Sequence, residues 1–210
     1  MTFHALADAI YPAGQHTRKP SSYLALYDDL FAPMRDRPLS MLELGVHSGH
    51  SLHLWHRFFL RARITGLDMR PCPADIPPDR VAYVQGRQED PEAVAEAAVN
   101  GPFDIIIDDA SHVGRLTKAS FGLLFRDHLK PGGLYVLEDI AASTTLPDWP
   151  DYRPMVAEPD EGHRFPSYDT GMIGVLKQVI DQAATGRGEV ASVEVHPSVA
   201  VIRKRGGSTS

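Results

Sequence analysis

Residues 103–112 constrain the fold of this chain most, because a strongly apolar run stops there abruptly in acids. Three consecutive isoleucines, Ile105–Ile107, follow a Gly-Pro turn and predict a β-strand that is buried on both faces. A second apolar run, residues 133–137, also ends in two acids. The polar residues at the two ends are Asp108, Asp109, Glu138, Asp139 and His112. Unpaired buried carboxylates are costly, so we expect positive charge between these strand ends.

Apolar runs that predict strands alternate with helical patterns along most of the chain. Besides the isoleucine run and 133–137, strands are predicted at 41–45, 64–68 and 81–86, with helices at 52–60, 91–99 and 116–128. This alternation is typical of right-handed βαβ units and a parallel sheet. A helix at 172–184 precedes two strands, 190–195 and 199–203, whose short turn requires an antiparallel hairpin. We therefore expect an α/β fold: a Rossmann-like, mostly parallel seven-stranded sheet with helices on both faces and a C-terminal antiparallel hairpin.

Size and composition indicate one domain with a sizeable core, since the chain has 210 residues. A net charge of -6 argues against nucleic acid as a partner, because a basic face would be expected for one. No apolar run approaches the length of a membrane span, and the N-terminus lacks a signal-peptide pattern. The single cysteine, Cys72, excludes an internal disulfide and fits a reducing compartment. We expect a cytoplasmic protein without a membrane partner.

The turn after the first predicted strand indicates a nucleoside-binding site. Its glycines, Gly45 and Gly49, let backbone N–H groups approach a polar ligand, and Asp68 at the end of the next strand is placed to bind ribose hydroxyls. The spacing differs from the G-x-G-x-x-G fingerprint of dinucleotide sites, and the chain has no G-K-[ST] phosphate-binding sequence. Glu43 would repel phosphate but suits an ammonium group, which S-adenosylmethionine carries. A plain strand–helix turn with a surface Asp68 is the alternative.

Four runs between residues 40 and 140 carry a resemblance to a known family. They are Leu42-Glu43-Leu44-Gly45-Val46-x-x-Gly49-x-Ser51-Leu52-x-x-Trp55, Gly66-Leu67-Asp68, Ile107-Asp108-Asp109-x-Ser111-His112 and Pro131-Gly132-Gly133-Leu134-Tyr135-Val136-Leu137-Glu138-Asp139. On these runs the chain resembles class I S-adenosylmethionine-dependent methyltransferases, and among them the metal-dependent macrolide and sugar O-methyltransferases and the cephalosporin-hydroxylase-like group. The resemblance implies that Gly45, Ser51 and Asp108 contact the methionine part, Asp68 the ribose and Gln88 the adenine. The chain departs from the family pattern at His47, His50 and Arg87, and Thr17-Arg18-Lys19 matches the family's Thr-Asp-Lys in part.

The acids at the two strand ends predict a metal site. Asp109, Glu138 and Asp139 offer hard oxygen ligands of the kind that Mg²⁺ prefers. A cation there would lower the pKa of an acceptor hydroxyl. His112 is the candidate general base and Asp109 the second catalytic residue, roles that the resemblance also implies. The alternative is that the acids cap the following helices.

The predicted function is therefore Mg²⁺-dependent methylation of a small-molecule hydroxyl, on a sugar of a glycosylated natural product. Catechol-type methylation and a catalytically inactive S-adenosylmethionine-binding module stay open as alternatives, and a homo-oligomer is a further expectation. Four histidines at every third position also fit a zinc site, although we expect them to be solvated or packed: His47, His50, His53 and His56.

The single domain, residues 1–210, divides into four segments by pattern. Residues 1–38 are expected to form an N-terminal helical and lid segment, and 39–140 the cofactor and metal core. Residues 141–170 lack a regular pattern and are predicted to form an acceptor lid, with a disordered insertion as the alternative; 171–205 form the last helix and hairpin. The lid residues expected to contact a sugar are Asp148, Trp149, Tyr152, His163, Phe165 and Tyr168, opposite the loop 16–23.

Overall fold

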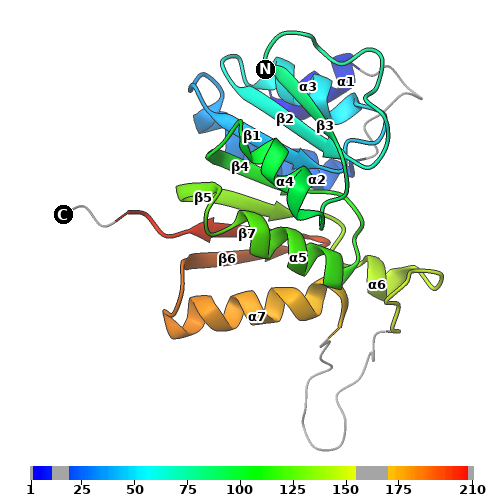
Figure 1. Cartoon of the computed structure of the whole chain (residues 1–210), viewed down its shortest axis with the longest axis vertical. Coiled ribbons are helices and arrows are strands. Elements are labelled where there is room, and N and C mark those ends of the chain that lie inside the picture. The colour runs from blue at the N-terminus through cyan, green and yellow to red at the C-terminus, as the bar shows by residue number, and fades with distance from the viewer. Residues whose placement is uncertain (1, 11–18, 155–169, 208–210) are drawn as a thin grey trace, which may run out of the picture.

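The computed structural model describes residues 2–10, 19–154 and 170–207. Within them, seven strands form one sheet in the order β3-β2-β1-β4-β5-β7-β6 (Figure 1). The strands are β1 (Ser40–Leu44), β2 (Arg63–Asp68), β3 (Val81–Gln85), β4 (Phe103–Asp108), β5 (Leu129–Leu137), β6 (Val190–His196) and β7 (Val199–Lys204). Strands β1 to β5 are parallel, β7 runs antiparallel to β5, and β6 runs antiparallel to β7. The predicted fold class and closing hairpin are confirmed.

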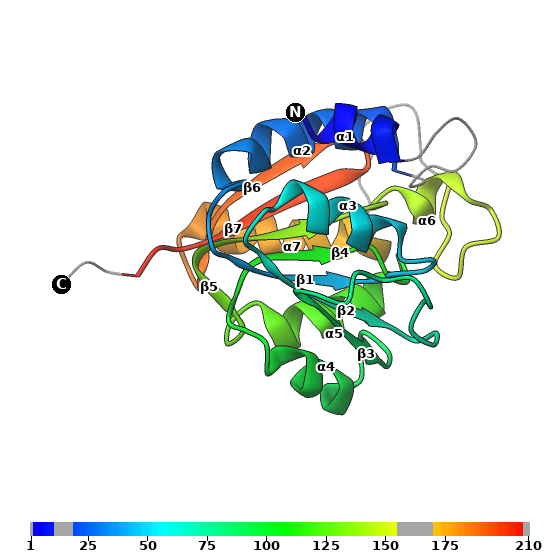
Figure 2. The ribbon, with the colours of Figure 1, turned by 90° about the horizontal axis from the view of Figure 1, so that it is seen from above.

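Helices cover both faces of this sheet, as predicted (Figure 2). One face carries α1 (Phe3–Ile10), α2 (Ser21–Phe31) and α3 (His50–Phe58), and the other carries α4 (Pro91–Ala98), α5 (Gly114–Leu124) and α7 (Gly171–Thr185). Local sequence sets the helix ends: the Asp90 side chain accepts the Glu92 N–H at the start of α4, and Gly186, with φ +67°, ends α7. The short helices η1 (Ala32–Met34) and α6 (Ala142–Thr145) complete the described elements.

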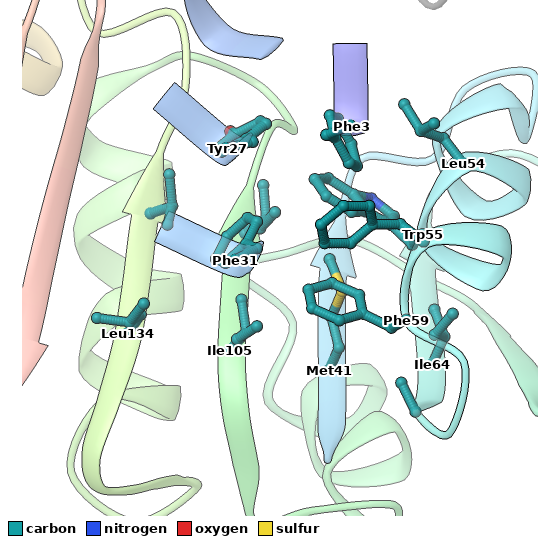
Figure 3. Close-up of a cluster of buried hydrophobic side chains, with 14 of the residues drawn as sticks. Phe3, Tyr27, Phe31, Met41, Leu54, Trp55, Phe59, Ile64, Ile105 and Leu134 are labelled. Carbon is teal, nitrogen blue, oxygen red and sulfur yellow. The ribbon is translucent and has the colours of Figure 1, made fainter. Parts of the chain in front are cut away.

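The isoleucine run of β4 is buried from both sides. Ile105 and Ile107 pack into the cluster under α1, α2 and α3, whereas Ile106 packs into the cluster under α4, α5 and α7. The first cluster is rich in fully buried aromatic side chains, drawn in Figure 3: Phe3, Tyr27, Phe31, Trp55 and Phe59. Burying one such side chain contributes about 1.5–3 kcal/mol. Helices α1 and α2 are therefore part of the core that supports the strand ends.

Several elements differ in their bounds from the sequence prediction. Strand β5 begins at Leu129, before the predicted Lys-Pro-Gly-Gly turn, and its pairing with β4 shifts register between Phe103 and Ile105. Helix α5 begins at Gly114, two residues earlier than expected, and α6 occupies part of the segment for which no regular structure was predicted. None of the helices in the described part of the chain is both long enough and apolar enough to cross a membrane.

Candidate active site

One cavity of about 650 Å³ opens at the carboxyl ends of the parallel strands. Eight of the residues predicted from sequence line it: Gly45, Ser51, Asp68, Gln88, Asp109, His112, Glu138 and Asp139. Glu43, Gly49 and Asp108 are not among the lining residues. We call the side of the cavity at Gly45, Asp68 and Gln88 the glycine-loop end, and the side at Asp109, His112, Glu138 and Asp139 the acid end. Ligands of open α/β sheets bind at such a position.

The glycine loop closes tightly against the end of β4. Gly45 has φ +85°, and a Cβ atom there would lie 2.1 Å from the carbonyl oxygen of Asp109, so only glycine fits. Asp68 fixes the same loop, since its Oδ2 accepts the N–H groups of Val46 and His47, each at 2.7 Å. Gly49, with φ +84°, starts α3. The acid predicted to bind ribose therefore also holds the loop.

Asp108 and Gln88 form a buried network beneath the cavity floor. The Gln88 amide nitrogen donates to Asp108 at 3.1 and 3.2 Å, and its oxygen accepts the Ser111 N–H at 2.9 Å. Ser120 donates to the same carboxylate at 2.8 Å. Burial raises the pKa of Asp108 to about 6, although the hydrogen bond from Ser120 acts in the opposite direction. The side-chain amide of Gln88 is thus held by Asp108 and Ser111, and the residue also lines the cavity.

Glu43 is fully buried behind the glycine-loop end. Its carboxylate accepts hydrogen bonds from Ser51 Oγ at 2.7 Å and Trp55 Nε1 at 3.0 Å, which tie β1 to α3. The ammonium group of Lys19 lies 3.9 Å from it. Burial raises the pKa of Glu43 to about 7, while Lys19, Trp55 and Ser51 favour the charged form. Contact between Glu43 and the cofactor stays a prediction.

The pairing of β4 with β5 brings the two acid-terminated strand ends together. Asp108 lies opposite Leu137, and the Glu138 N–H donates to the Asp108 carbonyl oxygen at 3.0 Å. Asp109 and Glu138 consequently share one cationic partner, because Lys19 Nζ lies 2.8 Å from Asp109 and 2.7 Å from Glu138. The positive charge expected between these strands is present as a lysine.

Lys19 is itself almost completely buried, with 5% of its side chain exposed. Burial alone would lower the pKa of this lysine, but the charges of Asp109, Glu138 and Glu43 together outweigh burial and raise it. The hydroxyl of Tyr27 donates to Glu138 as well, at 2.5 Å. Burial raises the pKa of Glu138 to about 8, and the charge of Asp109 acts in the same direction while Lys19 and Tyr27 oppose it.

The group in the described residues that is best arranged to hold a metal ion consists of Asp109, His112 and Asp139. One ligand atom from each lies within 4.8 Å of the others. The His112 Nε2 is 3.5 Å from Asp139 Oδ2, and Tyr23 donates to Asp139 Oδ1 at 2.7 Å. Carboxylate oxygens and an imidazole nitrogen suit a small divalent cation. Of the predicted ligands, Asp109 and Asp139 belong to this group and Glu138 does not, while Lys19 contacts both Asp109 and Glu138.

Sequence reasoning missed three residues of the acid end: Lys19, Tyr23 and Tyr27. Lys19 belongs to the N-terminal motif that matches the family in part, whereas no motif marks the two tyrosines. Trp149, expected to stack on a sugar, instead stacks on His112 at a ring-centroid distance of 5.9 Å. Three other predicted lid residues lie outside the described part of the chain: His163, Phe165 and Tyr168.

Comparison with known proteins supplies relatives for this arrangement. The chain is 33% identical over 208 residues to an 8-demethyl-8-alpha-L-rhamnosyl tetracenomycin-C 2'-O-methyltransferase of Streptomyces olivaceus, covering 89% of this chain and 51% of the relative. It is 37% identical over 164 residues to the mycinamicin VI 2''-O-methyltransferase of Micromonospora griseorubida, covering 74% of this chain and 38% of the relative. The chain is a homologue of sugar O-methyltransferases.

The fold comparison agrees with this homology. The MycE methyltransferase from the mycinamycin biosynthetic pathway, solved with Mg, SAH and mycinamycin VI, superposes with a TM-score of 0.80 at 29% identity. The superposition covers 100% of this chain and 55% of the solved chain. No family model matches the sequence. The chain spans about half the length, or less, of these relatives.

Proposed function

We propose that this chain transfers a methyl group from S-adenosylmethionine to a hydroxyl of a small molecule with the help of a divalent cation. One observation supports this function most: the glycine loop with Asp68 and the metal-capable group Asp109, His112 and Asp139 line a single cavity. A nucleoside donor and an activated hydroxyl would therefore be within reach of each other. Proximity of this kind accounts for much of the rate of a bimolecular reaction.

The residues of the acid end would divide the chemistry between them. Asp109, Glu138 and Asp139 would hold the cation, as predicted from sequence, and Lys19 would compete with it for two of these acids. A divalent cation bound there would lower the pKa of the acceptor hydroxyl. His112 lines the cavity with its Nε2 3.5 Å from Asp139 Oδ2, and in this proposal it accepts the hydroxyl proton and does not bind the cation. S-adenosylmethionine bound at the glycine-loop end would supply the methyl group to the deprotonated hydroxyl oxygen, with S-adenosylhomocysteine as the leaving group.

The acceptor we propose is a sugar of a glycosylated natural product, as in antibiotic biosynthesis. Support comes from the names of the relatives, which act on rhamnosyl and macrolide compounds. Since this chain matches only part of those proteins, acceptor class, oligomeric assembly and a cytoplasmic location stay predictions.

Methyl transfer from labelled S-adenosylmethionine to a panel of glycosides and catechols tests this function. We expect glycosides to be methylated in the presence of Mg²⁺, and EDTA to abolish transfer until Mg²⁺ is restored. Methylation of catechols alone would favour the catechol-type alternative. Binding of S-adenosylhomocysteine without turnover of any acceptor would instead identify an inactive binding module.

A further inference from the structure

The main chain at His112 adopts a conformation that needs external support. His112 has φ +52°, in the left-handed region that residues other than glycine rarely adopt. Such a residue costs about 1–3 kcal/mol and persists only where its surroundings hold it. Among the described residues, the buried imidazole Nδ1 has no hydrogen-bond partner. No described residue therefore orients this ring through Nδ1, in contrast to the usual arrangement of a catalytic histidine.

The contacts that hold His112 come instead from a segment 37 residues further along the chain. Trp149 Nε1 donates to the His112 carbonyl oxygen at 3.0 Å, and the two rings stack at an interplanar angle of 28°. Asp151 Oδ2 accepts the N–H of Gly114 at 2.8 Å, two residues beyond the histidine. One tryptophan and one aspartate thus fasten the turn at its strained residue and two residues after it.

This fastening segment, residues 146–153, follows α6 and returns to it at its far end. Ala142 N donates to Asp139 O at 2.9 Å where α6 begins, and Arg153 N donates to Ser143 O at 2.8 Å where the segment returns. Most side chains from Thr145 to Pro154 are exposed, but those of Trp149 and Asp151 are partly buried against the turn. The segment therefore connects the end of β5 to the turn after β4.

We propose that Trp149 and Asp151 are positioning residues that hold the His112 imidazole beside Asp139, a role that rests on His112 being the proton acceptor of the proposed function. Trp149 stacks on one face of the His112 ring and binds the His112 carbonyl oxygen. Asp151 binds the N–H of Gly114, where α5 begins. Neither residue is among those that line the cavity. A side chain of the predicted lid thus acts on the histidine.

Site-resolved labelling of histidines with diethyl pyrocarbonate tests this positioning without requiring a known acceptor. In Trp149→Ala we expect His112 to be modified several-fold faster, with the exposed His47 as internal reference. Trp149→Phe keeps a stacking ring and should restore most of the protection, and Asp151→Asn keeps an acceptor oxygen and should resemble the unchanged protein. Leu146→Ala, at a residue with 45% exposure in the same segment, is the matched control and should change nothing.

Kinetic measurements complete the test once a glycoside acceptor is in hand. Because a misplacement of about 1 Å can cost about 100-fold in rate, we expect Trp149→Ala to lower kcat by about 10–100-fold. The KM for S-adenosylmethionine and the affinity for S-adenosylhomocysteine should stay unchanged, which also shows that the variant is folded. Unchanged labelling of His112 in Trp149→Ala would overturn the proposal. Faster labelling with unchanged kcat would support the positioning contact while contradicting the role of His112 as base, so the two failures are distinguishable.

Discussion

The carboxylates at the two ends of the cavity are held by different kinds of partners. At the glycine-loop end, Asp68 accepts backbone N–H groups, and Asp108 beneath it is held by an amide and hydroxyls. At the acid end, Asp109 and Glu138 share the charged Lys19, and the Tyr27 hydroxyl also donates to Glu138. Neutral donors satisfy a carboxylate without competing with a cation, whereas a lysine occupies the position of one.

This difference indicates that the glycine-loop end is preformed and that the acid end can exchange its cation. Hydrogen bonds from the backbone cannot leave without unfolding the loop. The ammonium group of Lys19, in contrast, is carried by a flexible lysine side chain two residues before α2. A divalent cation can compete with this group for the same carboxylate oxygens. Substitutions at the two ends should therefore have separable effects on metal binding and on cofactor binding.

The largest effect is expected for Asp109→Asn at the acid end. Loss of this ligand should remove several kcal/mol of stabilisation, which corresponds to about a 1000-fold lower rate of methyl transfer. Mn²⁺ binding, followed by electron paramagnetic resonance, should weaken in parallel, while S-adenosylhomocysteine affinity stays within a factor of about two. Asp104→Asn is the control, because Asp104 is on the same strand but pairs with Lys130 and Ser40 at the opposite end. Normal Mn²⁺ binding by Asp109→Asn would contradict the metal site.

A smaller and complementary effect is expected for Asp68→Asn at the glycine-loop end. Hydrogen bonds to a charged group contribute about 1.5–3 kcal/mol each, so S-adenosylhomocysteine should bind about 10–100-fold more weakly in isothermal titration calorimetry. Mn²⁺ affinity should not change. Asp75→Asn, at a side chain that is 79% exposed, provides the control. Equal losses of both affinities would show that the two ends are not independent.

The sequence predicts the strand ends of this molecule better than the side chains that reach them from distant segments. Alternating patterns predicted the seven-stranded sheet, and acids after apolar strands predicted that Asp109 and Glu138 would meet, because adjacent strand ends converge by topology alone. Lys19 was not predicted as their partner, since it arrives from a segment 90 residues away in sequence from Asp109. Its contact depends on how α2 packs on the sheet, which no local pattern encodes. The contact of Trp149 with His112 depends on tertiary packing in the same way.

Lys19→Met tests whether the lysine competes with a metal ion at the acid end. Removing one positive charge about 4 Å from the site should strengthen Mn²⁺ binding by at least about 1 kcal/mol, or about fivefold. Lys118→Met, at an exposed lysine that contacts Gln178, should leave Mn²⁺ binding unchanged. Weaker Mn²⁺ binding by Lys19→Met would mean that the lysine arranges the ligands and does not compete with the ion.

The smallest effect concerns the pH dependence of stability, which Glu43 influences from behind the glycine-loop end. Burial raises the pKa of Glu43 from 4.5 to about 7, so between these values the folded protein binds a proton more tightly than the unfolded chain. The free energy of unfolding should consequently be highest below pH 4.5 with respect to this group and fall as pH rises to about 7. In urea unfolding, Glu43→Gln should make the free energy of unfolding depend less on pH between pH 5 and pH 7. The slope should change by at most about 1.4 kcal/mol per pH unit. Glu96→Gln, on the exposed face of α4, should leave the slope unchanged. An unchanged slope in Glu43→Gln would show that Lys19, Trp55 and Ser51 keep Glu43 charged despite its burial.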